Sequence, residues 1–271
     1  MIIDCFPYFN EKELLELRIR LLYTKVDRFI ITEADHTHSG KPKELTLLET
    51  LKRIDVPLDK ILYVPVMLPS LEEEPSHWVR ERMQRDAASA YIKESDIVFV
   101  SDCDEILNPK YIDYAFQVKM NHPRNILRTP MAYLCGRADL RVYDAYNTPI
   151  SWNSPYIVSG KQLKDYSLSE IREDHAWRRH ALNDKDIYIT EDNNLKELGW
   201  HFTWMGNLER LLIKENSYCH AGEYTVSKDY QAKDGASDPL GRGDHILKNY
   251  NDVILNGIID QSKRIKEFLL P

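Results

Sequence analysis

The sequence has few cysteines and no long apolar run, and these absences exclude several classes of protein. Its four cysteines, Cys5, Cys103, Cys135 and Cys219, lie far apart and include no C-x-x-C pair, so neither a zinc knuckle nor a disulfide framework is expected. No stretch of about 18 apolar residues occurs, so we expect no transmembrane anchor. The sequence begins without the basic region and apolar run of a signal peptide, and we therefore expect a cytoplasmic protein.

An excess of positive charge is also missing. The chain has 36 lysines and arginines against 43 aspartates and glutamates, which gives a net charge of −7. A general nucleic-acid-binding function is therefore not expected, because it needs a basic surface that neutralises phosphates. With 271 residues, 43% of them hydrophobic, the chain is long enough and apolar enough to bury a full core.

Short β-rich runs alternate with amphipathic stretches through the first half of the chain. This alternation is typical of parallel strands joined by helical crossovers. We expect strands at 2–6, 29–32, 61–66 and 97–101, helices at 11–23, 44–54 and 76–93, and a helical tail at 246–270 that breaks near Asn256 and Gly257. Ser76 is the expected N-cap of the third helix.

These elements predict one α/β domain over residues 1–271, with a mixed, mainly parallel central sheet and a helical C-terminal tail. We expect residues 1–125 to bind a nucleotide sugar. Residues 126–245, where aromatic residues become frequent, are expected to bind the acceptor and to complete the metal site, and residues 246–271 to form the C-terminal helices. The glycine-bearing loop 228–244 is expected to close as a lid over bound donor.

An acidic cluster follows the apolar run Ile97–Val100, which is typical of a central strand covered on both faces. Ligands bind at the carboxyl ends of strands in such sheets. Asp102 and Asp104 would raise each other's pKa unless a cation neutralised them, and Mg²⁺ or Mn²⁺ bridges carboxylates to substrate phosphates. We therefore expect a metal site here, and the alternative is a strand end capped by solvated acids. The second Asp-x-Asp, at 184–186, is expected to be a solvated loop.

The glycine-rich phosphate loops of common nucleotide-binding folds are missing. Neither G-x-x-x-x-G-K-[ST] nor a G-x-G-x-x-G after the first strand occurs. Nucleotide binding must therefore use another scaffold. The GT-A fold of nucleotide-sugar glycosyltransferases fits, since its alternating N-terminal half ends in a strand followed by Asp-x-Asp.

Several segments together resemble glycosyltransferase family 17, the family of the β-1,4-mannosyl-glycoprotein β-1,4-N-acetylglucosaminyltransferase. They are Asp4 to Phe6 with Asn10-Glu11, Leu14 to Arg20, Val26 to Ile31 with Glu33, Gly40 to Pro42, Ser101 to Glu105, Gly199 to Phe202 with Gly206, and Lys214 with Ser217 to His220. The resemblance implies an inverting, metal-dependent transfer of N-acetylglucosamine from UDP-GlcNAc to a saccharide hydroxyl in a β linkage. The region 135–195 resembles the family least, which leaves the acceptor open.

The metal and donor roles have candidates within this resemblance. We expect Asp104 to bind the metal, Asp102 to contact the ribose or a metal-bound water, and His201, with His220 as second choice, to complete the site. The candidates for donor binding are Phe6, Asn10, Glu33 as acceptor of the uracil N3–H, Lys41, Arg82, Arg85 and Trp200. The structural alternatives are a packed core position for His201 and Trp200, a solvated strand end for Glu33, and an exposed helix face for Arg82 and Arg85.

The catalytic base has three unranked candidates, Glu173, Asp174 and Glu223, the acids nearest the other site motifs in the sequence. Arg172, Arg178 and Arg179 either contact phosphates or pair with neighbouring acids, and pairing is favoured. Two other functions stay open. One is a catalytically silent sugar-nucleotide or glycan-binding module, because binding and turnover use the same acids. The other is a haloacid-dehalogenase-type phosphohydrolase, although there Asp-x-Asp usually follows the first strand and precedes Gly-Thr or Gly-Val.

Overall fold

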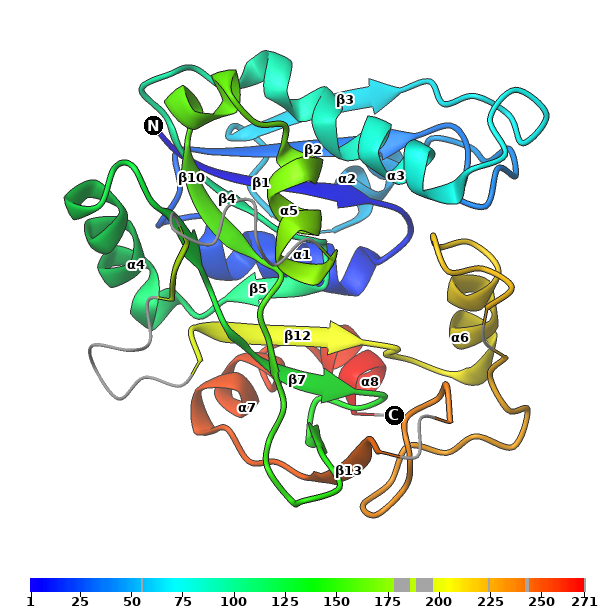
Figure 1. Cartoon of the computed structure of the whole chain (residues 1–271). Coiled ribbons are helices and arrows are strands. Elements are labelled where there is room, and N and C mark those ends of the chain that lie inside the picture. The colour runs from blue at the N-terminus through cyan, green and yellow to red at the C-terminus, as the bar shows by residue number, and fades with distance from the viewer. Residues whose placement is uncertain (55, 178–185, 189–196, 224, 242–243, 271) are drawn as a thin grey trace.

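The computed structural model describes residues 1–54, 56–177, 186–188, 197–223, 225–241 and 244–270, with the backbone alone for 174–177 and 186–188. Within these residues the chain forms two sheets with helices packed around and between them (Figure 1). The second Asp-x-Asp, together with Arg178 and Arg179, lies outside the residues whose side chains are described.

The first sheet is mixed and mainly parallel, as predicted. Its described strands follow the order β11-β6-β10-β4-β1-β2-β3. β1, β2, β3 and β4 run parallel, while β10 lies antiparallel between β4 and β6. The strands are β1 (Ile2–Tyr8), β2 (Arg28–Ala34), β3 (Ile61–Val66), β4 (Ile97–Val100), β6 (Ile126–Arg128), β10 (Tyr156–Ser159) and β11 (Asp186–Tyr188). Because β1, β2 and β4 are parallel neighbours, the loops that follow them meet at one edge of the sheet.

The second sheet follows the order β13-β8-β7-β12-β5, with β9 beside β7. Its strands are β5 (Glu105–Leu107), β7 (Met131–Cys135), β8 (Leu140–Tyr143), β9 (Ser151–Trp152), β12 (Gly199–Thr203) and β13 (Ile246–Asn249). β12 pairs with β5 so that His201 lies opposite Glu105. This pairing brings a late segment of the chain to the acidic turn that follows β4.

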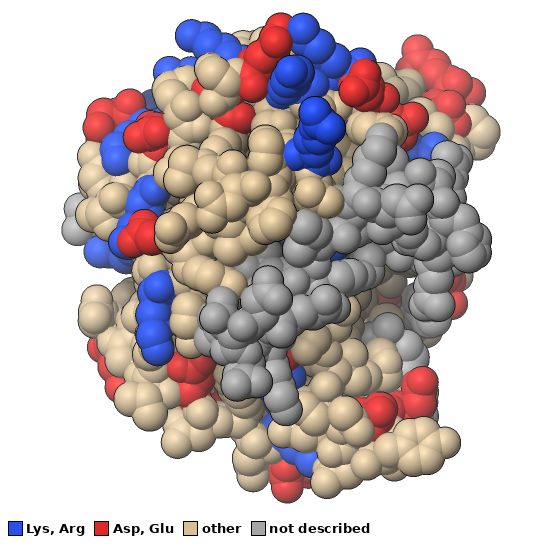
Figure 2. Space-filling view, turned by 60° about the vertical axis from the view of Figure 1, so that its left-hand side comes forward, with Lys and Arg blue, Asp and Glu red and all other residues tan. Residues whose placement is uncertain are grey.

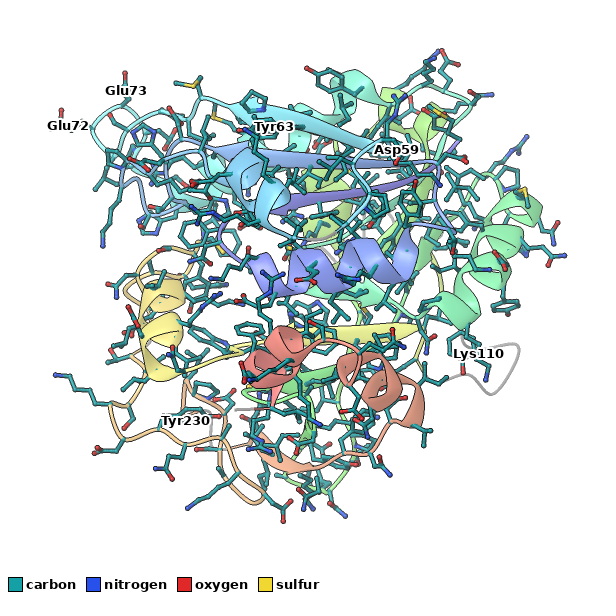
Figure 3. All side chains as sticks on the ribbon, turned by 180° about the vertical axis from the view of Figure 1, so that it is seen from behind. Asp59, Tyr63, Glu72, Glu73, Lys110 and Tyr230 are labelled. Carbon is teal, nitrogen blue, oxygen red and sulfur yellow. The ribbon has the colours of Figure 1, made fainter. Side chains whose placement is uncertain are left out.

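Helix α1 (Lys12–Leu22) lies between the first sheet and the C-terminal helix α8 (Lys263–Leu269) (Figure 3). It is therefore buried on several sides, and Leu15, Leu17 and Leu22 are each 0% exposed. Burial of one such side chain contributes roughly 1.5–3 kcal/mol. The main apolar cluster runs from this helix into both sheets. The single domain over residues 1–271 stays a prediction.

The other helices surround the sheets. They are α2 (Leu47–Arg53), α3 (His77–Asp86) with a 3₁₀ extension (Ala87–Tyr91), α4 (Pro109–Asn121), a 3₁₀ turn (Gly160–Lys164), α5 (Leu168–Trp177), α6 (Leu208–Glu215) and α7 (Val253–Ile259). Asn108 caps α4 ahead of Pro109 at the first helical position. Ser76 precedes α3 as predicted, but its side chain makes no capping hydrogen bond. No helix in the described part of the chain is long and apolar enough to cross a bilayer.

The C-terminal tail differs from the predicted pair of helices. Residues 246–249 form β13, because they pair with β8. Asn256 and Gly257 lie inside α7, and the break comes after Ile259. Ser262 starts α8 by accepting a hydrogen bond from the Ile265 backbone N–H.

Acidic and basic side chains are interspersed over the upper part and along the left-hand and lower parts of the face shown in Figure 2, with uncharged residues between them. Charge on the visible part of this face is therefore mixed, as the overall composition suggests.

Two glycine-to-alanine substitutions should have opposite effects on stability. A methyl group at Gly199 would lie 2.2 Å from the Ile106 carbonyl oxygen and would push β12 away from β5, whereas nothing lies within 4 Å of one at Gly257. We expect Gly199→Ala to lower the free energy of unfolding by about 1–3 kcal/mol. Gly257→Ala in α7 should raise it by about 0.5–1 kcal/mol. Urea denaturation of both variants measures this difference, and equal changes would contradict the close approach of β12 and β5.

Candidate active site

Two cavities meet at the carboxyl end of β4. The first, of about 170 Å³, lies where β1, β2 and β4 end, and the second, of about 360 Å³, lies among α3, α5, β7 and β12. Residues common to both cavities are Glu81, Arg85, Asp102, Asp104, Lys214, Tyr218 and Cys219. We call this shared boundary the junction. Both carboxylates of the first Asp-x-Asp motif are therefore at the junction, beside the two spaces that a two-part ligand would fill.

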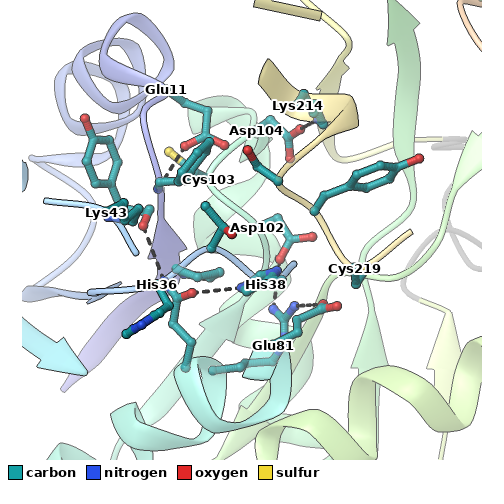
Figure 4. A pocket seen from close by; sticks show the side chains of 18 residues that line it. Glu11, His36, His38, Lys43, Glu81, Asp102, Cys103, Asp104, Lys214 and Cys219 are labelled. Atoms are coloured by element: carbon teal, nitrogen blue, oxygen red, sulfur yellow. Dashed lines mark hydrogen bonds and ion pairs between the residues drawn. The ribbon is translucent and has the colours of Figure 1, made fainter. Parts of the chain in front are cut away.

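The first cavity is walled by the loops after β1 and β2, by α3 and by the segment 217–219 (Figure 4). Gln84 of α3 fixes the two strand ends, because its amide donates to the carbonyls of Tyr8 (3.3 Å) and Thr32 (3.2 Å). The same side chain pairs through Oε1 with His38 Nε2 at 2.9 Å. Tyr8 and Phe9 add aromatic surface to this cavity.

The second cavity is rich in aromatic side chains. The ring of His201 stacks on Tyr133, with centroids 5.3 Å apart, and lies 4.6 Å from Trp152. Trp78 meets His220 edge to face at 4.7 Å. Such surfaces suit the apolar faces of sugar rings.

Asp102 is held by two arginines. Its Oδ1 accepts from Arg85 (2.9 Å) and its Oδ2 from Arg172 (2.5 Å). Burial by itself would raise the pKa of Asp102, but Arg172 and Arg85 outweigh it and lower this pKa to about 2. Each arginine also pairs with a second acid, Arg85 with Glu81 and Arg172 with Glu105. This carboxylate is ionised at neutral pH and fixed in orientation.

Asp104 has a different environment. Its Oδ2 lies 3.0 Å from the Lys214 Nζ, and its Oδ1 lies 3.7 Å from the His201 Nε2. Burial alone would raise the pKa of Asp104, but Lys214 and His201 hold it well below its usual value. His201 comes close because the Phe202 backbone N–H donates to the Asp104 carbonyl at 2.8 Å.

A buried arginine holds the acidic turn from behind. Arg18 of α1 is 0% exposed and forms a two-point ion pair with Asp4 of β1 (2.8 and 2.5 Å). It also donates to the carbonyls of Asp102 (2.7 Å) and Glu105 (2.9 Å) and to the hydroxyl of Ser101 (2.6 Å). Arg18 therefore ties α1 and β1 to the turn that carries both aspartates.

Asp104 and His201 are a donor set that fits a hard divalent cation. Within the described residues, no group of three or more His, Cys, Asp or Glu side chains is arranged to hold a metal ion. Mg²⁺ and similar ions, however, are commonly bound by one or two protein ligands, with substrate phosphates and water supplying the rest. An ionised carboxylate with an imidazole at 3.7 Å, beside two cavities, meets that requirement.

The structure brings many of the predicted site residues together. Asp102, Asp104 and Arg85 lie at the junction, and His201, His220, Arg82 and Glu173 line the second cavity. Arg172 pairs with acids, as its favoured interpretation stated. Of the predicted lid at 228–244, Leu240 reaches the second cavity, and closure over a donor stays a prediction.

Three predicted donor-binding residues have structural roles instead. The Glu33 carboxylate accepts from the backbone N–H of Thr46 (2.7 Å) and Leu47 (3.0 Å) at the start of α2, and is therefore occupied before any uracil binds. Phe6 is 1% exposed under the guanidinium of Arg18. Trp200 is also 1% exposed, and its indole N–H donates to Asp252.

Three of the remaining predicted residues line neither cavity, namely Lys41, Asn10 and Glu223. Lys41 is exposed and Asn10 is half-buried. Glu223 is half exposed and pairs with His220 Nδ1 at 2.7 Å. The side chain of Asp174 lies outside those described.

Sequence reasoning missed the roles of Arg18, Lys214 and the aromatic pair Tyr133 and Trp152. A signal for Arg18 existed, because Asp4 interrupts an apolar strand and Arg18 an apolar helix, and two such charges are stable in a core when they pair. For Lys214 the signal was its place in one of the segments that resemble glycosyltransferase family 17, and this did not indicate its partner.

Removal of Arg18 should destabilise the fold strongly. Arg18→Met leaves Asp4 buried without its cation, and we expect a loss of about 3–5 kcal/mol in the free energy of unfolding. Arg53→Met, which breaks the exposed pair with Glu49, is the matched control and should change stability little. Urea denaturation measures both, and similar small losses would refute the structural role of Arg18.

Comparison with known proteins finds one family match and several similar solved structures. The family model of glycosyltransferase family 17 matches residues 1–126. No curated protein matches the chain. Among solved structures, it is similar to S. aureus TarS 1-349 in complex with UDP (14% identity, 76% of this chain and 61% of that one, TM-score 0.45). It is also similar to a 4-diphosphocytidyl-2C-methyl-D-erythritol synthase (13% identity, 65% and 85%, TM-score 0.37).

These structural similarities are too low to identify a function, so the functional assignment rests on the family match alone. It covers β1 to β4, the acidic turn and α4, which include the first cavity's strand loops and both aspartates of the junction. It supports a glycosyltransferase activity. The match over residues 1–126 supports the assignment to glycosyltransferase family 17 that the sequence predicts.

Proposed function

We propose that this chain is an inverting, divalent-cation-dependent glycosyltransferase that moves N-acetylglucosamine from UDP-GlcNAc to a saccharide hydroxyl, forming a β linkage. The observation that carries the proposal is the junction of two cavities at Asp102 and Asp104. The three parts of a nucleotide sugar follow the same order as the site. The nucleoside fits the first cavity, the diphosphate fits the junction, and the sugar fits the second cavity.

The charges at the junction favour a diphosphate that arrives with a cation. Three carboxylates of the junction, Asp102, Asp104 and Glu81, lie beside two of its cations, Arg85 and Lys214, and the adjoining pair of Arg172 and Glu105 adds no net charge. A diphosphate alone would add to the negative excess, whereas a diphosphate with a divalent cation would not. Asp104 and His201 would hold that cation, which would neutralise the charge that develops on the departing diphosphate.

Glu173 is the proposed base. Of the three predicted candidates, it is the one whose described side chain lines the second cavity. Arg82 holds its two carboxylate oxygens at 2.5 and 2.8 Å, which fixes their orientation. In the proposed step the acceptor oxygen attacks the anomeric carbon, its proton goes to Glu173, and the bond to UDP breaks with both electrons on the leaving oxygen. A single displacement of this kind inverts the anomeric configuration.

The aromatic wall of the second cavity supports a saccharide acceptor. Tyr133, Trp152 and Trp204 line it beside His201. Flat rings of this kind bind the apolar faces of sugars and exclude water from the anomeric centre. When water is excluded, the donor is hydrolysed less, and its sugar can pass to a saccharide hydroxyl instead.

Loss of the Asp104 charge should abolish turnover. We expect Asp104→Asn to reduce UDP release from UDP-GlcNAc in the presence of Mn²⁺ by at least about a hundredfold, and EDTA to reduce wild-type release similarly. Asp113→Asn, at a position 76% exposed on α4, is the matched control and should keep wild-type activity.

The same assay separates the competing functions. If the wild type binds no UDP-sugar, the proposal is wrong. If it binds UDP-GlcNAc but releases no UDP with any saccharide, the chain is a silent sugar-nucleotide-binding module.

Replacement of the base should affect the chemical step rather than donor binding. Glu173→Gln keeps the size of the side chain but cannot take a proton, so we expect kcat to fall about 10²–10⁴-fold with little change in KM for UDP-GlcNAc. Glu170→Gln, on the exposed side of α5, is the control, and Asp174→Asn tests the neighbouring candidate. An unchanged kcat in Glu173→Gln, with a large loss in Asp174→Asn, would move the role to Asp174.

A further inference from the structure

We propose that the Lys214 ammonium has two positions in the site. It neutralises Asp104 while the site is empty and transfers to the donor's diphosphate when a divalent cation binds Asp104. This inference rests on the proposed function and assigns it a further substrate-binding residue.

The position of Lys214 places it in competition with a metal ion. Its Nζ lies 3.0 Å from Asp104 Oδ2 (Figure 4). The His201 Nε2 lies 3.7 Å from the other carboxylate oxygen, Oδ1. A cation bound to both Asp104 and His201 would therefore meet the Lys214 ammonium at the same carboxylate. Two cations this close repel each other, so metal binding favours the departure of Lys214.

Lys214 differs from the neighbouring Arg85 and Arg172 in how it is anchored. Arg85 bridges Glu81 and Asp102, and Arg172 bridges Asp102 and Glu105, so each is fixed by two carboxylates and is at most 11% exposed. Among the ion pairs described, Lys214 makes one, with Asp104; its Nζ also lies 5.6 Å from the centroid of the Trp204 ring and is attracted by Glu11, and its side chain is 32% exposed. Lys214 is therefore the cation of the junction that moves at the lowest cost.

The proposed position of the diphosphate lies next to Lys214. The residue lines both cavities, so its ammonium stands at the boundary where the diphosphate is proposed to lie. A lysine is a compact charge on four rotatable carbons with three donors, and it can exchange a carboxylate for a phosphate oxygen by rotamer change alone. Ser39, which bonds to the backbone of Asn216 and Ser217, holds the end of α6 in place during this exchange.

This exchange makes binding of the cation and of the nucleotide interdependent. The metal releases Lys214 for the diphosphate, and the diphosphate draws Lys214 away from Asp104 and so frees the metal site. Coupling of this kind is reciprocal, because each ligand raises the affinity of the other by the same factor. A direct bond between metal and phosphate adds to the coupling but does not depend on Lys214.

The test is titration calorimetry of Lys214→Gln with Mn²⁺ alone, UDP alone, and each in the presence of the other. We expect Mn²⁺ alone to bind the variant more tightly than the wild type, UDP to bind more weakly, and the coupling factor to fall, each by about 5- to 100-fold. Lys214→Arg, which retains the charge, should remain near the wild type. Lys110→Gln, at an exposed position on α4 (Figure 3), is the control for loss of a lysine elsewhere.

The outcomes separate this inference from the proposed function. If the wild type binds neither Mn²⁺ nor UDP in any combination, the proposed function fails, and this inference fails with it. If the wild type binds both and Lys214→Gln reproduces its Mn²⁺ affinity or its UDP affinity, the role of Lys214 is overturned while the function stands. Circular dichroism melting shows whether the variant is folded.

Discussion

The ion pair between Arg18 and Asp4 is the interaction on which the rest of the site depends. It joins α1 to β1 inside the core, and the remaining donors of the same guanidinium hold the carbonyls and the hydroxyl of the turn after β4. Burial alone would lower the pKa of Arg18, but Asp4 more than offsets it and the side chain stays charged. Because the turn is fixed from its buried side, its two aspartates face the cavities.

Charge compensation is the second constraint. Each junction carboxylate has a cationic partner, and the partners differ in how they are anchored: Arg85 and Arg172 each bridge two acids, while the ion pair of Lys214 is with Asp104. A site built in this way keeps its aspartates ionised and oriented without a ligand. An incoming anion meets cations that are already in place, which reduces the reorganisation needed on binding.

Each of the two sheets positions the residues of one cavity. The first sheet places the loops of β1, β2 and β4 around one cavity, and the second sheet brings His201, Tyr133 and Trp152 to the other. The link between them is local: β5 follows the acidic turn directly and pairs with β12. The family match over residues 1–126 covers β1 to β5, and therefore the strand loops of the first cavity, and it ends before Tyr133, Trp152 and His201 of the second cavity.

The sequence by itself determined the alternating elements of the first half and the acidic turn after β4, because hydrophobic period and strand-end position are local properties. Tertiary structure decided the rest. It converted Glu33, Phe6 and Trp200 from candidate ligands into a helix cap and core residues, and it turned the start of the C-terminal tail into β13. It also brought Lys214 to Asp104, across 110 positions of sequence. Contacts over such separations depend on how sheets and helices pack, and no local pattern encodes that packing.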